Sequence, residues 1–160
     1  MNLQPIATKL IASLANELIN QGHRGTGKLI ASLKSEVDNI NLKVVIKSKF
    51  YATFVNNGVL PRQIKYPFAK KRIDALRTWV MRVLKKSDKE ARGLAYAIAR
   101  THKEQGMPSF NSYRHSKNGR RRNFVQFAIA SEKKFIKEEL KKEFTKDFQV
   151  RINNIIAKTK

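Results

Sequence analysis

Apolar side chains in the first forty residues follow a helical period. Between residues 6 and 18 they recur every three or four positions, which predicts a helix with Pro5 in its first turn and Gly22 at its C-terminal stop. The apolar positions of Lys28–Val37 predict a second, shorter helix, which begins at Thr26 or at a neighbouring glycine.

The pattern changes after residue 40. The β-branched run Leu42–Lys47 predicts a strand. Residues 50–55 fit either a second strand or a helical turn. The triplet Asn56-Asn57-Gly58 predicts a turn, and Pro61 and Pro67 bracket a loop.

The helical period returns at Ile73 and covers most of the remaining chain. Ser87 and Asp88 interrupt it and predict the N-cap of a further helix, which ends at Gly106. Alanines on one face of that helix indicate close packing against a neighbouring helix.

The last segment carries apolar side chains from Phe124 to Ile156, mostly in steps of three or four. Steps of four overshoot a full helical turn by about 40°, so the apolar stripe rotates slowly around a straight helix. Such a helix has to wrap, break or contact different neighbours along its length. We expect a break near residues 145–149.

These elements predict an α+β fold that is predominantly helical, with an N-terminal helix, a small β-sheet and long C-terminal helices. We expect residues 1–68 to form an α+β core and residues 69–160 to form a basic helical extension of the same domain. The length of 160 residues and the apolar content of 41% are sufficient for one hydrophobic core.

The composition indicates in which compartment the protein is made. No apolar run approaches the roughly 20 residues that a membrane span needs. Residues 1–5 lack the basic start and apolar block of a signal peptide. The chain contains no cysteine, which excludes disulfides and thiolate chemistry. We therefore expect synthesis in a cytoplasm and no membrane partner.

The charge is strongly positive. Lys and Arg outnumber Asp and Glu by 34 to 12, which gives a net charge of +22. Residues 60–134 hold 20 of the basic and 5 of the acidic side chains. Such a field favours polyanions, because neutralising phosphates releases condensed counterions. The alternative is that an acidic protein supplies the opposite charge.

One segment resembles a nucleotide-binding loop. Gly22–Lys28 fits the first seven positions of G-x-x-x-x-G-K-[ST], but Leu29 occupies the eighth, where a hydroxyl would bind Mg²⁺. The residues before it have a helical period, whereas a phosphate-binding loop follows a buried strand. We therefore interpret the segment as a glycine-rich joint and expect no nucleotide cofactor.

The sequence shows no catalytic or metal-binding constellation. His23, His102 and His115 are far apart, and neither cysteines nor paired carboxylates join them at ligand spacing. Acidic residues such as Glu138 and Glu139 lie among lysines, which is typical of solvated pairs on a helix face. We expect a protein that is not an enzyme and binds no cofactor or metal.

The segment Pro108–Asn123 is polar and basic and predicts an exposed, mobile loop. Phosphate contact needs only reachable cations, whereas base readout needs a rigid element, and no recognition helix is evident. We expect nonspecific backbone contact or docking of an acidic partner. The candidate contact residues are Arg114, Lys117, Arg120, Arg121 and Arg122.

The first 60 residues resemble the neck or tail-completion proteins of tailed bacteriophages, small proteins that form rings between the capsid portal and the tail. Three segments in the family's order carry the likeness: Thr26–Ser32, the strand at Val44–Ile46, and Tyr51–Gly58. The residues that match the family's fold motif are Gly25, Gly27, Leu29, Ser32, Tyr51, Ala52 and Gly58.

The chain departs from that family at two places. Asn56 stands where the family carries an acid, and a long basic helical region replaces its short, strand-rich ending. The pattern of residues 73–106 is similar to longer versions in phages of gut Bacteroidales, including the crAss-like group.

The resemblance implies a structural virion protein, assembled in the host cytoplasm, that forms a homo-oligomeric ring around the DNA channel. Its partners would be further copies of itself, adjacent portal, connector or tail proteins, and double-stranded DNA contacted without sequence preference. The alternative is a phage accessory protein of chromatin or packaging that binds nucleic acid nonspecifically.

Overall fold

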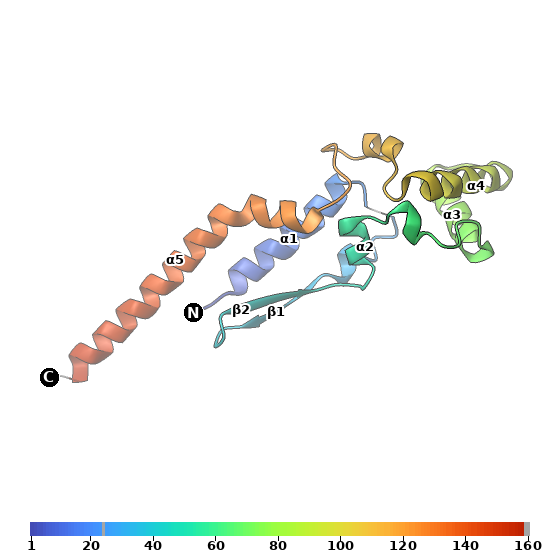
Figure 1. The fold of residues 1–160 in the computed structure, drawn as a ribbon. Helices are drawn as coiled ribbons and strands as arrows, with labels where there is room; N and C mark the ends of the chain where they lie inside the picture. Colours follow the sequence, from blue (N-terminus) through green and yellow to red (C-terminus); the bar gives the residue numbers. More distant parts are fainter. Residues whose placement is uncertain (24, 159–160) are drawn as a thin grey trace. The chain divides into compact units, whose positions relative to one another are not determined.

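A computed structural model describes residues 1–23 and 25–158 (Figure 1). Its regular elements, in chain order, are α1 (Gln4–Asn20), β1 (Lys34–Asp38), β2 (Lys43–Lys47), α2 (Ala52–Asn57), α3 (Lys70–Val83), α4 (Asp88–Gln105) and α5 (Phe124–Lys158). Short 3₁₀ turns occur at Ile30–Ser32, Pro61–Gln63 and Phe110–His115. This order confirms the predicted α+β, predominantly helical class.

The chain packs into two compact units, each built from segments that are distant in sequence. Unit 1 comprises residues 1–17, 29–49 and 124–160, and unit 2 comprises residues 18–28 and 50–123. The units do not follow the predicted boundary between residues 68 and 69. The difference arises because α5 belongs with α1 and the strands, while α2 belongs with the segments that follow it.

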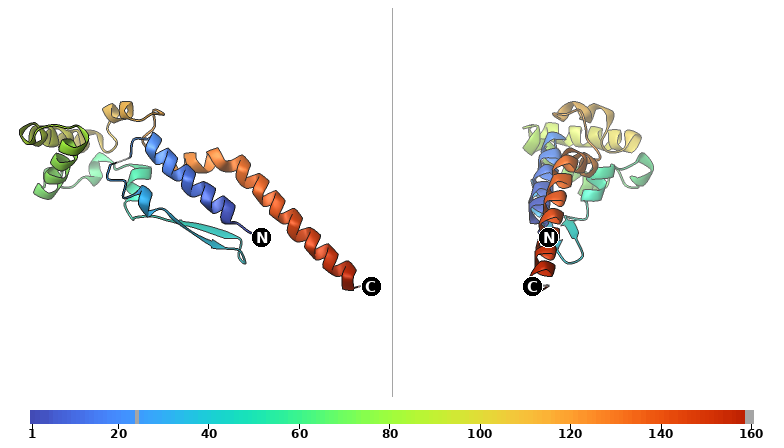
Figure 2. Two further views of the ribbon diagram at one scale, coloured as in Figure 1. Left: turned by 180° about the vertical axis from the view of Figure 1, so that it is seen from behind. Right: turned by 90° about the vertical axis from the view of Figure 1, so that its left-hand side faces the viewer.

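In unit 1, α1 and the first half of α5 run antiparallel and side by side (Figure 2). Three sets of polar contacts, in order along the pair, join Ser13 to Ala128 and Ser131, Lys9 to Glu132, and Asn2 to Glu143. The buried apolar side chains of this unit are Leu3, Ile6, Ala7, Leu14, Leu29, Phe124 and Ala128. The helical spacing of these residues in α1 confirms its predicted inward face.

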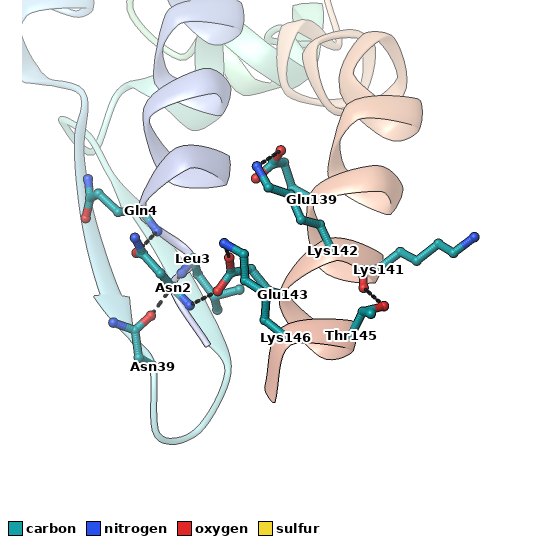
Figure 3. A network of polar contacts seen from close by, with 10 residues as sticks. All are labelled: Asn2, Leu3, Gln4, Asn39, Glu139, Lys141, Lys142, Glu143, Thr145 and Lys146. Carbon is teal, nitrogen blue, oxygen red and sulfur yellow. Dashed lines mark hydrogen bonds and ion pairs between the residues drawn. The ribbon is translucent and has the colours of Figure 1, made fainter. Parts of the chain in front are cut away.

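A polar network fixes the start of α1 (Figure 3). The backbone N–H of Asn2 donates to Glu143 Oε2 at 2.8 Å, and that of Leu3 donates to Asn39 Oδ1 at 3.0 Å. The Asn2 hydrogen bond, followed by that from Lys146, lowers the pKa of Glu143. Because Glu143 lies beside the start of α1, residues 144–158 of α5 continue past the end of that helix.

β1 and β2 pair antiparallel, with Glu36 opposite Val45. The turn between them is closed by Asp38, whose Oδ1 accepts from the backbone N–H groups of Ile40 and Asn41 at 2.9 Å each. The predicted helix over residues 28–37 is therefore wrong. Its apolar spacing was outweighed by pairing with β2, because a lone β-branched strand leaves its backbone hydrogen bonds unmade.

α5 is continuous over its 35 residues, so the predicted break near residues 145–149 is also wrong. Instead, the apolar stripe rotates around an unbroken helix that has different neighbours along its length. Polar contacts join residues 128–143 to residues 2–13, whereas the later part of α5 exposes large apolar side chains. Within the described residues, no helix combines the length and the apolar character needed to cross a membrane.

In unit 2, α3 and α4 form a helical hairpin. Ile73 and Leu76 of α3 pack against Ala95 and Ala99 of α4, and the buried alanines allow the close approach that the sequence indicated. Ser87 caps α4 as predicted, because its hydroxyl accepts from the N–H of Glu90 while the Glu90 carboxylate accepts from the N–H of Ser87.

The alternative that the sequence left open at residues 50–55 is settled as helical, since α2 covers most of them. Gly58 follows α2 with φ +78°. Val59 and Met107 then exchange two backbone hydrogen bonds of 2.7 and 2.8 Å. This bridge ties the end of the Tyr51–Gly58 segment to the end of α4.

Candidate nucleic-acid or partner interface

The predicted contact residues lie in residues 113–122, which we call the basic loop. Backbone and side-chain hydrogen bonds attach it to the turn after α1. Lys117 N–H donates to Asn20 O at 2.7 Å, and Gln21 Nε2 donates to Arg122 O at 2.9 Å. Just past the loop, Asn123 N–H donates to Asn56 O at 2.7 Å. The loop is thus held by segments roughly 70 and 100 residues earlier in the chain.

Gly22 lies directly against the backbone of the basic loop. His23 N–H donates to Leu18 O and Gly22 N–H donates to Ile19 O, the pair of bonds that ends a helix with a left-handed glycine. The φ of Gly22 is +76°, and a Cβ at this position would lie 2.7 Å from His115 O. Gly22 is therefore the predicted helix stop, and the basic loop also rests on it.

Arg121 and Arg122 are half-buried. A Cβ on Gly58 would lie 2.6 Å from Arg122 Nε and 2.6 Å from Met107 O, so the Arg122 guanidinium lies against the glycine backbone. Burial lowers the pKa of Arg121, although an arginine side chain keeps its charge in proteins. Arg121 thus packs against Gly22 and Arg122 against Gly58.

The other three predicted contact residues are exposed. Arg114, Lys117 and Arg120 lie at the surface of the basic loop. The backbone N–H of Arg120 donates to Asn118 Oδ1 at 3.2 Å, which shapes the tip of the loop. The predicted set is therefore divided into three cations that face solvent and two that pack inward, and its contact with DNA or an acidic partner stays a prediction.

Two histidines of unit 2 have strongly perturbed pKa values. Burial, followed by the charge of Arg121, lowers the pKa of His23 to about 4, and His23 Nε2 lies 3.2 Å from Arg121 O. Burial and the charge of Arg72 lower the pKa of His102 to about 4. His102 Nδ1 lies 3.3 Å from Arg72 Nη2, which requires a neutral ring that accepts. Both rings are neutral near pH 7.

The segment that resembles a phosphate-binding loop lies between α1 and a 3₁₀ turn, without the strand and helix that would flank such a loop. Gly25 and Gly27 have positive φ values of 20° and 70° and open space around them. Arg24 lies outside the described residues.

The remaining residues of the fold motif lie at the ends of elements. Leu29 is buried, and Ser32 Oγ donates to Leu29 O at 2.7 Å and accepts from Lys49 N–H at 3.2 Å. Tyr51 is the N-cap residue of α2 and Ala52 its first residue, while Gly58 ends it. The motif thus marks the joints between elements.

Sequence reasoning missed the buried polar anchors of the loop. Gln21 is 0% exposed and Asn56 is 8% exposed. Neither position carries a local signal, because each is defined by a partner far along the chain. No group of three or more His, Cys, Asp or Glu side chains in the described part of the chain is placed to hold a metal ion.

Comparison of the chain with protein-family models, with curated proteins and with solved structures finds no match.

Proposed function

We propose that this chain is a structural subunit of a bacteriophage neck, where it forms a homo-oligomeric ring around the DNA channel between portal and tail. The order of the motifs in the first 60 residues supports this assignment. So does the position of the matching glycines and of Tyr51 at joints between elements. The proposed partners are further copies of the chain, the adjacent portal, connector or tail proteins, and double-stranded DNA.

One observation carries the proposal of an assembly. The distal segment of α5, residues 144–158, lies beyond α1 and exposes five large apolar side chains, at Phe144, Phe148, Val150, Ile155 and Ile156. At 100° per residue Phe144, Phe148 and Ile155 lie within an arc of about 40° on one side of the helix. Exposed apolar surface of this kind is typical of protein interfaces. A head-to-tail ring needs such a surface, because each copy must offer the next one a different face.

The charge supports a position next to DNA. Unit 2 carries twenty basic and four acidic side chains, a net charge of +16, while unit 1 carries the remaining +6. Weak attraction to many phosphates holds DNA without reading its sequence, so that the duplex can slide. The exposed cations Arg114, Lys117 and Arg120 of the basic loop are the proposed contacts to DNA or to an acidic neighbour.

Mass spectrometry of purified virions tests the proposal. We expect the chain in mature particles at a fixed copy number that matches a ring. Replacing Phe144 and Phe148 by Gln should abolish incorporation, whereas Tyr66→Gln with Phe110→Gln, two exposed aromatics of unit 2, should leave it intact. Absence of the wild-type chain from virions would contradict the neck assignment.

The concentration of charge in unit 2 favours one alternative, a free nucleic-acid-binding accessory protein of phage chromatin or packaging. Such a protein would bind duplex DNA as a monomer or dimer with a steep salt dependence. It would be found in infected cells and not in purified particles, which the same measurement shows.

A further inference from the structure

α4 has one face that consists almost entirely of cations. Five exposed residues define this cationic face: Lys89, Arg92, Tyr96, Arg100 and Lys103. Their steps of three and four residues place them within an arc of about 80°, at 100° per residue. The adjacent face, centred about 100° away around the helix, holds the fully buried Ala91, Ala95 and Ala99. Through Ala95 and Ala99 it packs against α3.

The charges of this face are not neutralised within unit 2. Two of its nearby acids are engaged elsewhere, since Asp88 pairs with Arg77, and Glu90 pairs with Lys86 while it caps the helix. Glu104 stands one turn after Arg100 without an ion pair to it in the described chain. The four basic side chains likewise have no acidic partner among the described residues.

Tyr96 lies in the middle of the cationic face. Its ring stacks on Phe68, with 6.3 Å between centroids and 23° between planes. The stack covers one side of the Tyr96 ring. The phenolic hydroxyl remains a donor suited to a phosphate oxygen.

The face has few of the anchors that a protein partner would need. Protein interfaces are centred on buried apolar or aromatic anchors, and although arginine is enriched there, lysine is depleted. On this face the aromatic is Tyr96, which stacks on Phe68. Between its cations α4 offers only Gly93 and Ala97 beside Tyr96. A partner that presents regularly spaced negative charge fits this composition better than a folded acidic protein does.

We propose that α4 binds the phosphate backbone of double-stranded DNA through its cationic face. The face extends about 21 Å from Lys89 to Lys103 at 1.5 Å per residue. A duplex presents about one negative charge per 1.7 Å, or about twelve over that length. Because phosphate contacts carry no base information, this contact is independent of sequence. This site is separate from the basic loop and does not rest on the ring assignment.

The test is a salt titration of binding to a 30-base-pair duplex, followed by fluorescence anisotropy between 50 and 200 mM NaCl. The variant Lys89→Gln, Arg92→Gln, Arg100→Gln, Lys103→Gln removes four phosphate contacts. The slope of log K against log salt should fall by about 3 to 4, and affinity at 100 mM should drop at least about tenfold. A second variant, Lys89→Arg with Lys103→Arg, keeps the charge and should keep the slope.

The matched control removes the same charge from α5, by Lys133→Gln, Lys134→Gln, Lys137→Gln and Lys141→Gln. It should change the slope by less than about 1. A third variant replaces the exposed loop cations, by Arg114→Gln, Lys117→Gln and Arg120→Gln. Circular dichroism and urea denaturation confirm that each variant is folded.

Several results would overturn the proposal. Equal losses in the α4 and α5 variants would mean that net charge alone binds DNA. A loss confined to the loop variant would place the contact in the basic loop. Binding of polyglutamate but not of duplex DNA would identify an acidic protein as the partner. None of these outcomes depends on whether the chain enters virions, which tests the neck assignment separately.

Discussion

Replacing Gly22 by alanine tests whether the basic loop is held by close packing on the end of α1. Gly22 has φ +76° and its missing Cβ would meet His115 O at 2.7 Å. Gly27 is a matched control, because its φ of +70° is similar but nothing lies within 4 Å of its missing Cβ. The difference between the two variants isolates the contact from the backbone strain.

The loss of stability has a different origin in the two variants. A left-handed backbone costs a non-glycine residue about 1–2 kcal/mol, and the reduced freedom of the unfolded chain returns about 0.4–1 kcal/mol. Gly27→Ala should therefore destabilise the protein by about 1 kcal/mol. In Gly22→Ala the loop also has to move, which disrupts the bonds from Lys117 to Asn20 and between His23 and Arg121. At about 1 kcal/mol each, these bring the loss to about 2–3 kcal/mol.

Urea denaturation followed by tryptophan fluorescence measures both losses. Trp79 is the single tryptophan of the chain and lies in α3, so its signal reports on unit 2, to which both glycines belong. Equal destabilisation of the two variants, within about 0.5 kcal/mol, would refute the packing of the loop on Gly22.

Two further predictions concern stability. The pKa of His23 and that of His102 are lowered to about 4 from 6.5, so the unfolded state binds more protons and stability is full above about pH 6.5 and falls as the pH drops toward 4. Because both rings keep some solvent access, each contributes about 1–2 kcal/mol. Urea midpoints at pH 7 and pH 4.5 measure this dependence, and His23→Gln should reduce the difference between them. The exposed His115→Gln is the control. An unchanged difference in His23→Gln would contradict the role of His23. Ser87→Ala should lower the free energy of unfolding by about 1 kcal/mol through loss of the α4 cap. Ser109→Ala, at a 3₁₀ turn without a side-chain cap, should lower it by less than about 0.5 kcal/mol. Equal urea midpoints of the two variants would argue against the cap.

The elements that sequence predicted well are those fixed by their own residues. The period of α1, the Ser87 cap and Gly106 at the end of α4 are local signals, and each is confirmed. The predicted helix over residues 28–37 and the predicted break in α5 failed where the surroundings of a segment decided its structure. Residues 34–38 follow β2 rather than their own apolar period, and α5 stays unbroken because its surroundings change along its length.

The sequence predicted which residues belong to the basic loop but not how they are arranged. The cluster Arg120-Arg121-Arg122 is visible in the sequence, but its division into exposed and half-buried side chains is not. That division depends on Gly58, which lies more than 60 residues before Arg122 and leaves room for its guanidinium. The cationic face of α4, by contrast, has a helical spacing that sequence alone could have shown.

The two proposals divide between the two units, which makes them separable by mutation. The exposed loop cations and the cationic face of α4 both belong to unit 2, whereas the distal segment of α5 belongs to unit 1. The quadruple α4 variant should therefore enter virions while losing salt-dependent affinity for DNA. The Phe144→Gln, Phe148→Gln variant should do the reverse, retaining the wild-type salt slope while failing to assemble. If each variant lost both properties, DNA binding and assembly would depend on one surface, and the assignment of separate roles to the two units would be wrong.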